Sequence, residues 1–523
     1  MTIRNVFEKR VKEHPGSIAM RYHDGDNWVS QTWGELSNNV KELAEGYVKS
    51  FSLKPREENT ALILPNSHLW VESYLAQSVI GMSVVPIDPK LHNDEVLYIL
   101  KDAEAVVVTT DKAHLMMMMK IAPSLPKLRA IVIIDGKIYD GQKIEDRAQV
   151  VELSKLRVPG AKEVYDNNRP EEDDVASIIY TSGTTGKPKG AMLTHRNFIS
   201  DIDGALQIFG APVNEKDSFL IVLPLFHAFS FTANLLAPIF TGARMYFVKS
   251  LRTVGQDVKE LKPTVLAAVP LLAEKLHAKI EDGLQKSKVA QFLLKIGLRG
   301  PVMHMVKLKL GGKLRFIGIG GAPADKKVLV GLNRLGIPTL EGYGLTECAP
   351  LVAYPAISGF KPGSVGKVLS CMEYKIVEQD ETGAGELCVR GPNVMKGYYK
   401  NQAATEEVVD ADGFFHTGDV VRDDKDGNIT ICGRRKALVV NREGKNIYPE
   451  EIEQVVGRLP YVAESLALSY FAKGEAGERI GLMVEANDEA CKPLGKTEQE
   501  RDGNLISVII RHCKERLADY KLP

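Results

Sequence analysis

The sequence has no stretch that could cross a membrane, since no run of about 18 uncharged apolar residues occurs in its 523 residues. Its first ten residues lack the apolar core of a secretory signal, so we expect no secretion. The six cysteines show neither CxxC pairing nor metal-ligand spacing, which predicts reduced and mostly buried thiols in a cytoplasmic protein. A net charge is also missing, because 67 basic residues balance 67 acidic ones. This balance excludes a whole-molecule attraction to nucleic acid or to anionic membranes.

A Walker A motif is absent too, although one loop has the composition of a phosphate-binding segment. The apolar run Val175–Tyr180 has the length of a strand and leads into Tyr180–Gly190, which is rich in glycine, hydroxyls and lysine. Its glycines, Gly183 and Gly186, do not have the GxxxxGK[ST] spacing. Glycines let backbone amides approach an anion, hydroxyls donate to phosphate oxygens, and lysines supply positive charge. The loop is therefore predicted to bind a polyphosphate, and its spacing disfavours the alternative of a plain mobile surface loop.

The chain is too long for one ordinary domain, and its pattern changes along its length. Strand-like segments alternate with helical ones over residues 59–136 and 218–270, which predicts an α/β fold with parallel sheets covered on both faces. After Gly363, short strands with glycine turns predict a small β-rich subdomain. The sharpest boundary separates residues 1–433, a large N-terminal domain, from residues 434–523, a small mobile α+β C-terminal domain.

Three further motifs follow the phosphate loop. Gly318–Pro323 is a run of small residues, Glu341–Glu347 places an aromatic ring between glycines, and Phe414–Asp419 ends in Thr-Gly-Asp. Small residues permit the close approach of a ligand, and a ring beside glycines forms a flat slot for a purine. Together these motifs resemble those of the adenylate-forming superfamily, which includes acyl-CoA synthetases, firefly luciferases and peptide-synthetase adenylation domains. The resemblance covers nearly the whole chain, although a single such motif is more often a plain turn.

The resemblance implies an ATP site made of the motif residues. The implied ATP-binding residues are Thr181, Ser182, Gly183, Thr184, Thr185, Gly186, Lys187, Gly321, Ala322, Pro323, Glu341, Gly342, Tyr343, Gly344, Thr346, Asp419 and Arg434. In this interpretation Asp419 accepts hydrogen bonds from both ribose hydroxyls, and Arg434 is a second ribose or phosphate contact. Glu347 is a hard oxygen ligand that, with Thr181, would hold Mg²⁺.

The implied catalytic residues are Thr184, Lys187, Glu347 and His227. In relatives, the loop that contains His227 borders the tunnel for the carboxylate substrate. The histidine would gate this tunnel or position the carboxylate. A lone histidine beside apolar residues is usually a satisfied core group, so both interpretations stay open for His227.

The C-terminal region matches the family less completely. Lys436 occupies the hinge at which the small domain of relatives rotates between two half-reactions, although Ala437 departs from the acidic residue common there. Gly444 and Lys445 match the loop that lines the tunnel for CoA. Relatives continue beyond the position of Pro523 to a lysine that reaches the reacting carboxylate, and no such C-terminal lysine occurs in this sequence. Either the sequence is a truncation or the protein lacks this lysine. The chain as written is expected to bind ATP but to form acyl-AMP slowly, since lost electrostatic stabilisation typically costs about 10²–10³ in rate.

The resemblance implies a reaction in two steps. A carboxylate attacks the α-phosphate of MgATP to give acyl-AMP and pyrophosphate, and the thiol of CoA then displaces AMP. The apolar segments Leu225–Phe240 and Leu271–Leu310 would line a tunnel for the acid. Because the second segment is most like that of long-chain fatty acyl-CoA synthetases, we expect a medium- or long-chain fatty acid. A helical hairpin without a ligand also explains this segment.

Other functions stay open. The acceptor could be the phosphopantetheine of an acyl carrier protein, or the chain could bind nucleotide or acyl groups with impaired adenylation. Basic residues within Leu271–Leu310 could rest the protein against anionic lipid at the inner face of a membrane, although solvated helix faces explain them equally well. These residues are Lys286, Lys288, Lys295, Arg299 and Lys307. The sequence does not define the oligomeric state.

Overall fold

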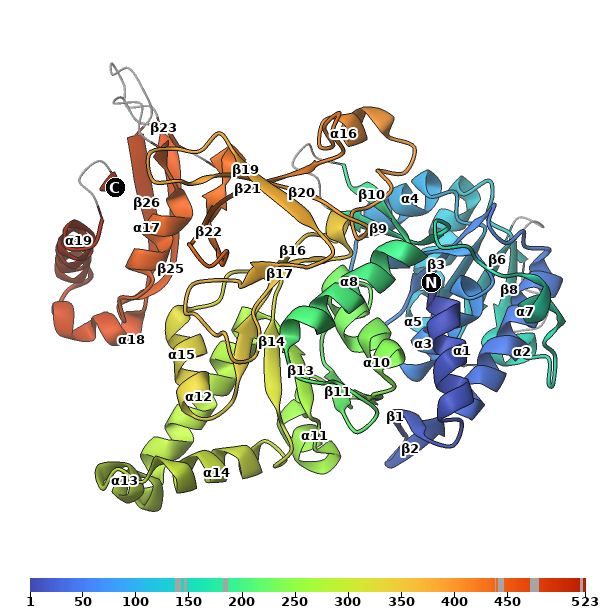
Figure 1. Cartoon of the computed structure of the whole chain (residues 1–523), viewed down its shortest axis with the longest axis horizontal. Helices are drawn as coiled ribbons and strands as arrows, with labels where there is room; N and C mark the ends of the chain where they lie inside the picture. Colours follow the sequence, from blue (N-terminus) through green and yellow to red (C-terminus); the bar gives the residue numbers. More distant parts are fainter. Residues whose placement is uncertain are drawn as a thin grey trace. The chain divides into compact units, whose positions relative to one another are not determined.

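The computed structural model describes residues 1–136, 143–144, 148–181, 187–437, 439–440, 446–470, 479–517 and 521–523 (Figure 1). The chain forms two compact units. The first contains residues 1–373 and 390–409, and the second contains residues 374–389 and 410–523. This grouping reflects packing rather than movement, so the predicted division between residues 433 and 434 stays a prediction.

The first unit contains an eight-stranded sheet, and the two strands that flank the predicted phosphate loop, β10 and β9, lie at one edge of it (Figure 1). Its strands, in order across the sheet, are β10 (Lys189–Thr194), β9 (Val175–Thr181), β4 (Ser83–Ile87), β3 (Asn59–Ile63), β5 (Val107–Thr110), β6 (Ala130–Ile133), β8 (Ala148–Glu152) and β7 (Lys143–Ile144). The six inner strands are parallel, and the outer β10 and β7 are antiparallel to their neighbours. The predicted parallel α/β architecture of this region is confirmed.

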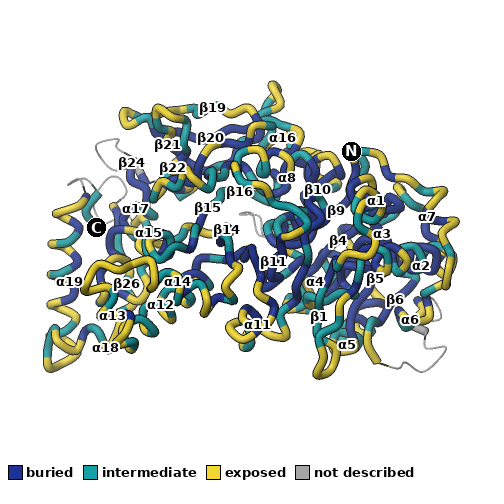
Figure 2. Tube along the Cα trace, turned by 60° about the horizontal axis from the view of Figure 1, so that its bottom comes forward, coloured by how far each residue is buried: buried dark blue, intermediate teal, exposed yellow. Residues whose placement is uncertain are grey.

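Helices cover this sheet on both faces because successive right-handed crossovers run in opposite directions along the strand order. They include α2 (Trp33–Phe51), α3 (His68–Ser78), α4 (Asn93–Asp102) and α5 (Lys112–Ile121). Ile63 of β3 shares a core with Ile99 of α4 and Ile121 of α5, and α3 packs against α2. Ser67 begins α3, because its hydroxyl accepts the N–H of Trp70 at 3.1 Å. Figure 2 shows the inner strands as buried.

A seven-stranded sheet forms the other half of the first unit. Its strands, in order, are β15 (Thr339–Glu341), β14 (Phe316–Ile319), β13 (Val265–Ala268), β11 (Ser218–Ile221), β12 (Arg244–Phe247), β1 (Ile18–Asp24) and β2 (Asn27–Thr32). All neighbouring strands are parallel except the β1–β2 hairpin. Ligands of open α/β sheets bind beyond the carboxyl ends of the strands. The motifs at Gly318–Pro323 and Glu341–Glu347 lie at those ends of β14 and β15.

The remaining elements of the first unit surround these sheets. They are α1 (Ile3–Glu13), η1 (Ala122–Ser124), α6 (Leu153–Leu156), α7 (Glu163–Asn167), α8 (His195–Phe209), α11 (Val254–Leu261), α12 (Pro270–Lys286), α13 (Lys288–Lys295), α14 (Arg299–Lys309), α15 (Lys326–Arg334), β16 (Tyr343–Gly344), η3 (Thr346–Cys348), β17 (Leu351–Tyr354), β18 (Lys367–Val368) and α16 (Gln402–Glu406).

The sequence predicts one regular helix over residues 231–240. The structure instead has α9 (Ala228–Ser230), a π-helical turn η2 (Phe231–Leu236) and α10 (Ala237–Thr241). Pro238 has no N–H to donate to the carbonyl of Asn234, which favours a wider turn at this point.

The second unit combines an antiparallel sheet with the C-terminal αβ region. The sheet contains β19 (Glu373–Val377), β20 (Gly385–Arg390), β21 (Phe415–Asp423) and β22 (Ile429–Arg434). After it come η4 (Arg435–Ala437), β23 (Val439–Val440), β24 (Asn446–Ile447), α17 (Pro449–Val456), β25 (Val462–Tyr470), β26 (Arg479–Ala486), α18 (Asp488–Cys491), η5 (Lys492–Leu494) and α19 (Glu498–Lys514). Ile452 of α17 and Ile509 of α19 lie in one core, and the Tyr448 hydroxyl donates to Asp380 at 3.3 Å. The predicted β-rich region and C-terminal α+β pattern are confirmed.

All six cysteines lie in the described part of the chain, where none is disulfide-bonded and four are buried, as the sequence predicts. Among the described residues, every helix is too short or too polar to span a bilayer.

Candidate functional site

The β9–β10 hairpin holds both ends of the predicted phosphate loop. Thr181 ends β9 and pairs with Lys189 at the start of β10. The Tyr180 hydroxyl donates to Asp102 of α4 at 2.6 Å, which fixes the hairpin to a neighbouring helix. Lys187 is exposed. Ser182, Gly183, Thr184, Thr185 and Gly186 lie outside the described residues, so their roles stay predictions.

Glu347 is held against the base of this hairpin. It lies in η3, which begins at Thr346 and packs against β10. The Glu347 carboxylate accepts the hydroxyl hydrogen of Tyr398 at 2.7 Å, and the Lys189 ammonium lies 5.2 Å from the centre of the Tyr398 ring. Burial and the nearby Glu347 carboxylate raise the pKa of Tyr398, so this hydroxyl remains a donor. The structure thus brings the acidic motif and the phosphate-loop hairpin together through Tyr398.

The glycines around Tyr343 leave no room for side chains. A Cβ on Gly344 would lie 2.0 Å from the carbonyl oxygen of Pro350, and one on Gly342 would lie 2.8 Å from the Tyr354 ring. Tyr343 itself is half-buried, so part of its ring stays accessible. The backbone therefore packs closely at both glycines, and the slot for a purine that the sequence suggests here stays a prediction.

Glu341 fixes the small-residue loop that follows β14. Its carboxylate accepts the N–H of Ala324 at 2.8 Å, next to the exposed Gly321, Ala322 and Pro323. Gly321 has a φ of +88°, a conformation that favours glycine. Burial raises the pKa of Glu341 to about 6, against the opposing effect of the Ala324 N–H.

We expect a Glu341→Gln variant to lose a pH dependence of stability. The native fold binds the proton of Glu341 more tightly than the unfolded chain does, because the native pKa is raised. The resulting stabilisation is fully present below about pH 4.5 and disappears as pH rises through about 6. The amide keeps an oxygen for the Ala324 N–H. Wild type should therefore lose about 2 kcal/mol of unfolding free energy between about pH 4.5 and 7.5 that the variant does not lose. Urea unfolding measures the difference, and Glu57→Gln, at an exposed site, should show none.

A buried polar pair supports the segment after Glu347, and the sequence analysis missed it. Asp201 of α8 accepts the N–H of Leu351 at 2.9 Å, and the Asn393 amide donates to the carbonyl oxygens of Cys348 and Leu351 at 3.1 and 2.9 Å. Complete burial raises the pKa of Asp201 well above its ordinary value. Asp201 could have been found from the sequence, because an acidic residue three positions after Phe198 lies on the apolar face of a helix.

His227 precedes α9 at the carboxyl end of β11 and is exposed, with its ring 4.5 Å from that of Phe226. Partial desolvation lowers the pKa of His227, and the Asp88 carboxylate opposes this shift. The ring is thus open to a ligand, and its part in catalysis stays a prediction.

The second unit brings Asp419 and Arg434 together. They face each other across β21 and β22, and the Arg434 guanidinium donates to the Asp419 carboxylate at 2.7 Å. Asp419 is buried, whereas Arg434 is exposed. The Thr417 hydroxyl accepts the N–H of Asp419 at 3.1 Å and donates to the Leu387 carbonyl at 2.7 Å. These bonds hold the carboxylate in place on the strand.

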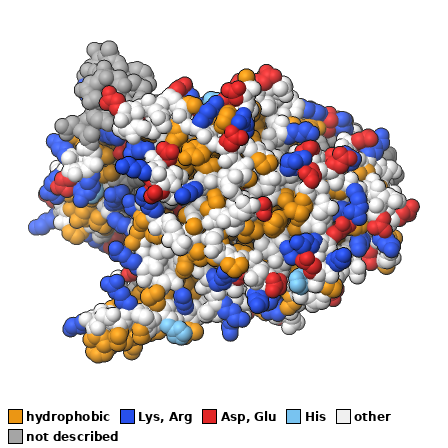
Figure 3. All heavy atoms as spheres, viewed as in Figure 1, with side chains coloured by type: hydrophobic (Ala, Val, Ile, Leu, Met, Phe, Trp, Pro, Cys, Tyr) orange, Lys and Arg blue, Asp and Glu red, His pale blue; other side chains and the backbone are white. Residues whose placement is uncertain are grey.

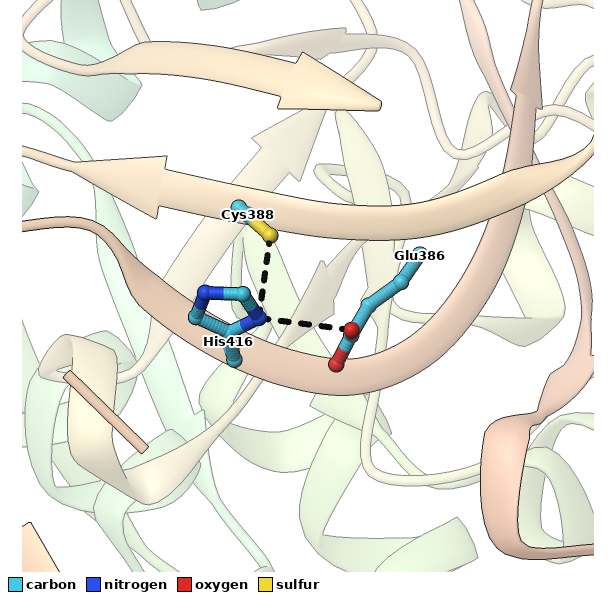
Figure 4. Close-up of side chains that lie close together, drawn as sticks. All are labelled: Glu386, Cys388 and His416. Carbon is cyan, nitrogen blue, oxygen red and sulfur yellow. Dashed lines mark hydrogen bonds and ion pairs between the residues drawn. The ribbon is translucent and has the colours of Figure 1, made fainter. Parts of the chain in front are cut away.

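Three side chains beside this turn lie close enough together to hold a metal ion: Glu386, Cys388 and His416 (Figure 4). His416 Nδ1 is 3.3 Å from a Glu386 oxygen and 3.4 Å from the Cys388 sulfur. However, Glu386 also pairs with Arg435 and accepts the N–H of Gly418 at 3.1 Å. Burial raises the pKa of Cys388 to about 11, which disfavours the thiolate that binds metals. We interpret this cluster as a support for the Thr-Gly-Asp turn.

Lys436, the predicted hinge residue, is exposed in η4 within the second unit. Gly444 and Lys445, predicted to line the CoA tunnel, lie outside the described residues.

The parallel sheets, with the predicted nucleotide motifs at their strand ends, have the architecture expected of an adenylate-forming enzyme. Residues 7–399 match the profile of the AMP-binding enzyme family, and the chain belongs to this family. It is 30% identical to long-chain-fatty-acid–CoA ligase 6 of Rattus norvegicus, over 94% of this chain and 73% of that protein. It is 31% identical to long-chain-fatty-acid–CoA ligase 1 of Homo sapiens, over 84% of this chain and 67% of that protein.

A solved structure agrees in fold. The o-succinylbenzoate CoA synthetase of Bacillus subtilis, in complex with its acyl-adenylate intermediate, has a TM-score of 0.75 and 26% identity, over 99% of this chain and 93% of that chain. The same enzyme was also solved with ATP and a magnesium ion, with a TM-score of 0.73, 26% identity, and 99% and 94% of the two chains covered. The chain is accordingly an AMP-forming acid–CoA ligase in class, and ATP, a carboxylate and CoA are the substrates of that class.

Proposed function

We propose that this ligase activates a medium- or long-chain fatty acid to acyl-AMP and then transfers the acyl group to CoA. The observation that supports the adenylation step is the contact of Glu347 with Tyr398, beside Lys189. This carboxylate lies at the base of the β9–β10 hairpin, which we propose binds phosphate. The fatty acid is supported by the names of the two ligases of rat and human.

The chain's own residues would act mainly by binding and orienting ATP. The hairpin segment Thr181–Lys187 would hold the β- and γ-phosphates, and the glycines around Tyr343 would receive the adenine. Asp419 and Arg434 would bind the ribose hydroxyls or a phosphate. Phosphoryl chemistry of this kind depends on positioning and on charge stabilisation. We further propose that Lys436 is a hinge between two half-reactions.

The donor groups near the hairpin suit a magnesium ion. Glu347 is only half-buried, its second carboxylate oxygen is not used by Tyr398, and Thr181 offers a hydroxyl. Carboxylate and hydroxyl oxygens are hard ligands of the kind that Mg²⁺ prefers. When bound with ATP, the ion would offset the negative charge that develops on the phosphates.

The acid-binding surface is proposed on the segment Leu225–Phe240 and the inner side of α12. Leu225, Phe231 and Leu235 are buried, and Leu276 and Ile280 of α12 pack on the core of the seven-stranded sheet. The rest of the predicted tunnel segment, in α13 and α14, contributes less, because many of its apolar side chains face solvent.

ATP–pyrophosphate exchange with carboxylates from acetate to about twenty carbons tests the proposal. We expect exchange to be fastest with acids of about eight carbons or more, because each buried methylene adds about 0.8 kcal/mol. Exchange that is fastest with acetate or an aromatic acid would contradict the fatty-acid assignment. The acceptor is tested by comparing the rates of acyl transfer to CoA and to a phosphopantetheinylated carrier protein. If the protein bound ATP but showed no exchange with any acid, a non-catalytic binding role would be favoured.

A further inference from the structure

One part of the first unit exposes large apolar side chains to solvent: α13 and the short connection from α13 to α14. Val289, Phe292, Ile296 and Leu298 expose 62%, 62%, 51% and 49% of their surface. We call these four residues the α13 apolar surface. Figure 2 shows this stretch as exposed, and Figure 3 shows hydrophobic side chains gathered at its end, beside basic ones.

The α13 apolar surface belongs to a well-anchored helix. Val289 and Phe292 recur at helical spacing and therefore share one side of α13, and Ile296 follows directly after the helix ends. Ala290, on the inner side, is fully buried, and Ser287 begins the helix by accepting the Ala290 N–H at 3.2 Å. The helix also packs against α12 and α14. A surface helix normally turns its apolar stripe inward, so this outward stripe indicates a surface that binds a partner.

The sequence segment that contains this surface carries charge of one sign only. Residues 283–324 contain no aspartate or glutamate, although the whole chain has no net charge. The basic residues in this range are Lys286, Lys288, Lys295, Arg299, Lys307, Lys309, Lys313 and Arg315. Lys288, Lys295 and Arg299 flank the apolar surface, are exposed, and form no ion pair within the described part of the chain. A partner that fits must be anionic on its surface and apolar just beneath it.

We propose that the α13 apolar surface docks the protein on anionic lipid bilayers. The apolar stripe enters the boundary between head groups and acyl chains, while Lys288, Lys295 and Arg299 contact the anionic head groups. Docking would bring the ligase to the membrane in which long-chain fatty acids dissolve. It adds to the proposed function, but the binding itself does not depend on the identity of the acid.

Co-sedimentation with vesicles tests this proposal. The probes are phosphatidylcholine vesicles with and without about 30 mol% phosphatidylglycerol. We expect binding to the anionic vesicles only, and weaker binding when salt is raised from about 0.1 M to about 0.5 M. The K288Q/K295Q/R299Q variant should bind about 10²-fold more weakly, since each basic residue contributes roughly fivefold. The V289S/F292S/I296S variant should bind at least about 10²-fold more weakly through lost apolar burial.

The matched control is K12Q/K54Q/K120Q, which makes the same charge change at exposed lysines elsewhere and should bind like wild type. Each variant should keep the unfolding midpoint of wild type, because the changed side chains are exposed. Equal binding of wild type to neutral and anionic vesicles, or unchanged binding of both surface variants, would overturn the proposal. A dimer that V289S/F292S/I296S dissociates, without vesicle binding, would assign the surface to a second copy instead. Pyrophosphate exchange with a soluble acid tests the proposed function separately, because it requires no vesicles.

Discussion

Replacing Glu347 with glutamine should lower the rate of acyl-AMP formation by about 10²–10³, measured as ATP–pyrophosphate exchange at saturating ATP. The amide oxygen can still accept the hydrogen bond that Tyr398 donates at 2.7 Å, so the packing of η3 against β10 should persist. What disappears is the negative charge beside the β9–β10 hairpin, which is proposed to bind phosphate. Because a neutral amide binds Mg²⁺ poorly, the Mg²⁺ concentration for half-maximal rate should also rise.

The matched variant is Tyr398→Phe, which removes the hydrogen bond but keeps the Glu347 charge. A hydrogen bond to a charged group contributes about 1.5–3 kcal/mol, so this variant should lose stability and less activity than Glu347→Gln. If Glu347→Gln kept the wild-type rate and Mg²⁺ dependence, the carboxylate would have only a structural role. If both variants lost the same activity and stability, the contact would position the loop without acting on ATP.

The sequence predicts those parts of the fold that depend on local pattern. The strand-like segments after Asn59 form parallel strands, and the helical segments between them form α3, α4 and α5. These features need only neighbouring residues or one sheet register to form.

Contacts between distant residues could not be predicted in this way. Tyr398 reaches Glu347 across 51 positions, and Asp201 reaches Leu351 across 150. Such partners are set by the way the sheets and loops pack, and one sequence without its fold does not specify them. The π-helical η2 likewise depends on how its segment meets the surrounding core. The parts of the candidate site that orient Glu347 therefore come from the structure, and the chemical identity of the site comes from the motifs.

Replacing Asp419 with asparagine should weaken ATP binding by about 10–10², measured by isothermal titration without a carboxylate substrate. A carboxylate can accept two charge-assisted hydrogen bonds from a ribose diol, and such bonds are about twice as strong as neutral ones. Asp419 is buried and already aligned by the Thr417 hydroxyl and by Arg434 at 2.7 Å, so little ordering is needed on binding. The asparagine oxygen can still accept from Arg434, and the strand pairing should survive.

The ligand itself supplies the sharper test of this role. The analogue 2′,3′-dideoxy-ATP lacks the two ribose hydroxyls that Asp419 would hold. Wild type should therefore bind ATP about 10-fold or more tightly than the analogue, whereas Asp419→Asn should bind the two nucleotides with nearly equal affinity. Asp423→Asn changes the same charge on the same strand at an exposed site and should behave like wild type. If Asp419→Asn weakened both nucleotides equally and lowered the unfolding midpoint, Asp419 would act through the β21–β22 pairing with Arg434 rather than on the ribose. Because the Arg434 side chain is 59% exposed, loss of that ion pair alone should change stability by about 1 kcal/mol or less, so the comparison of the two nucleotides decides between the roles.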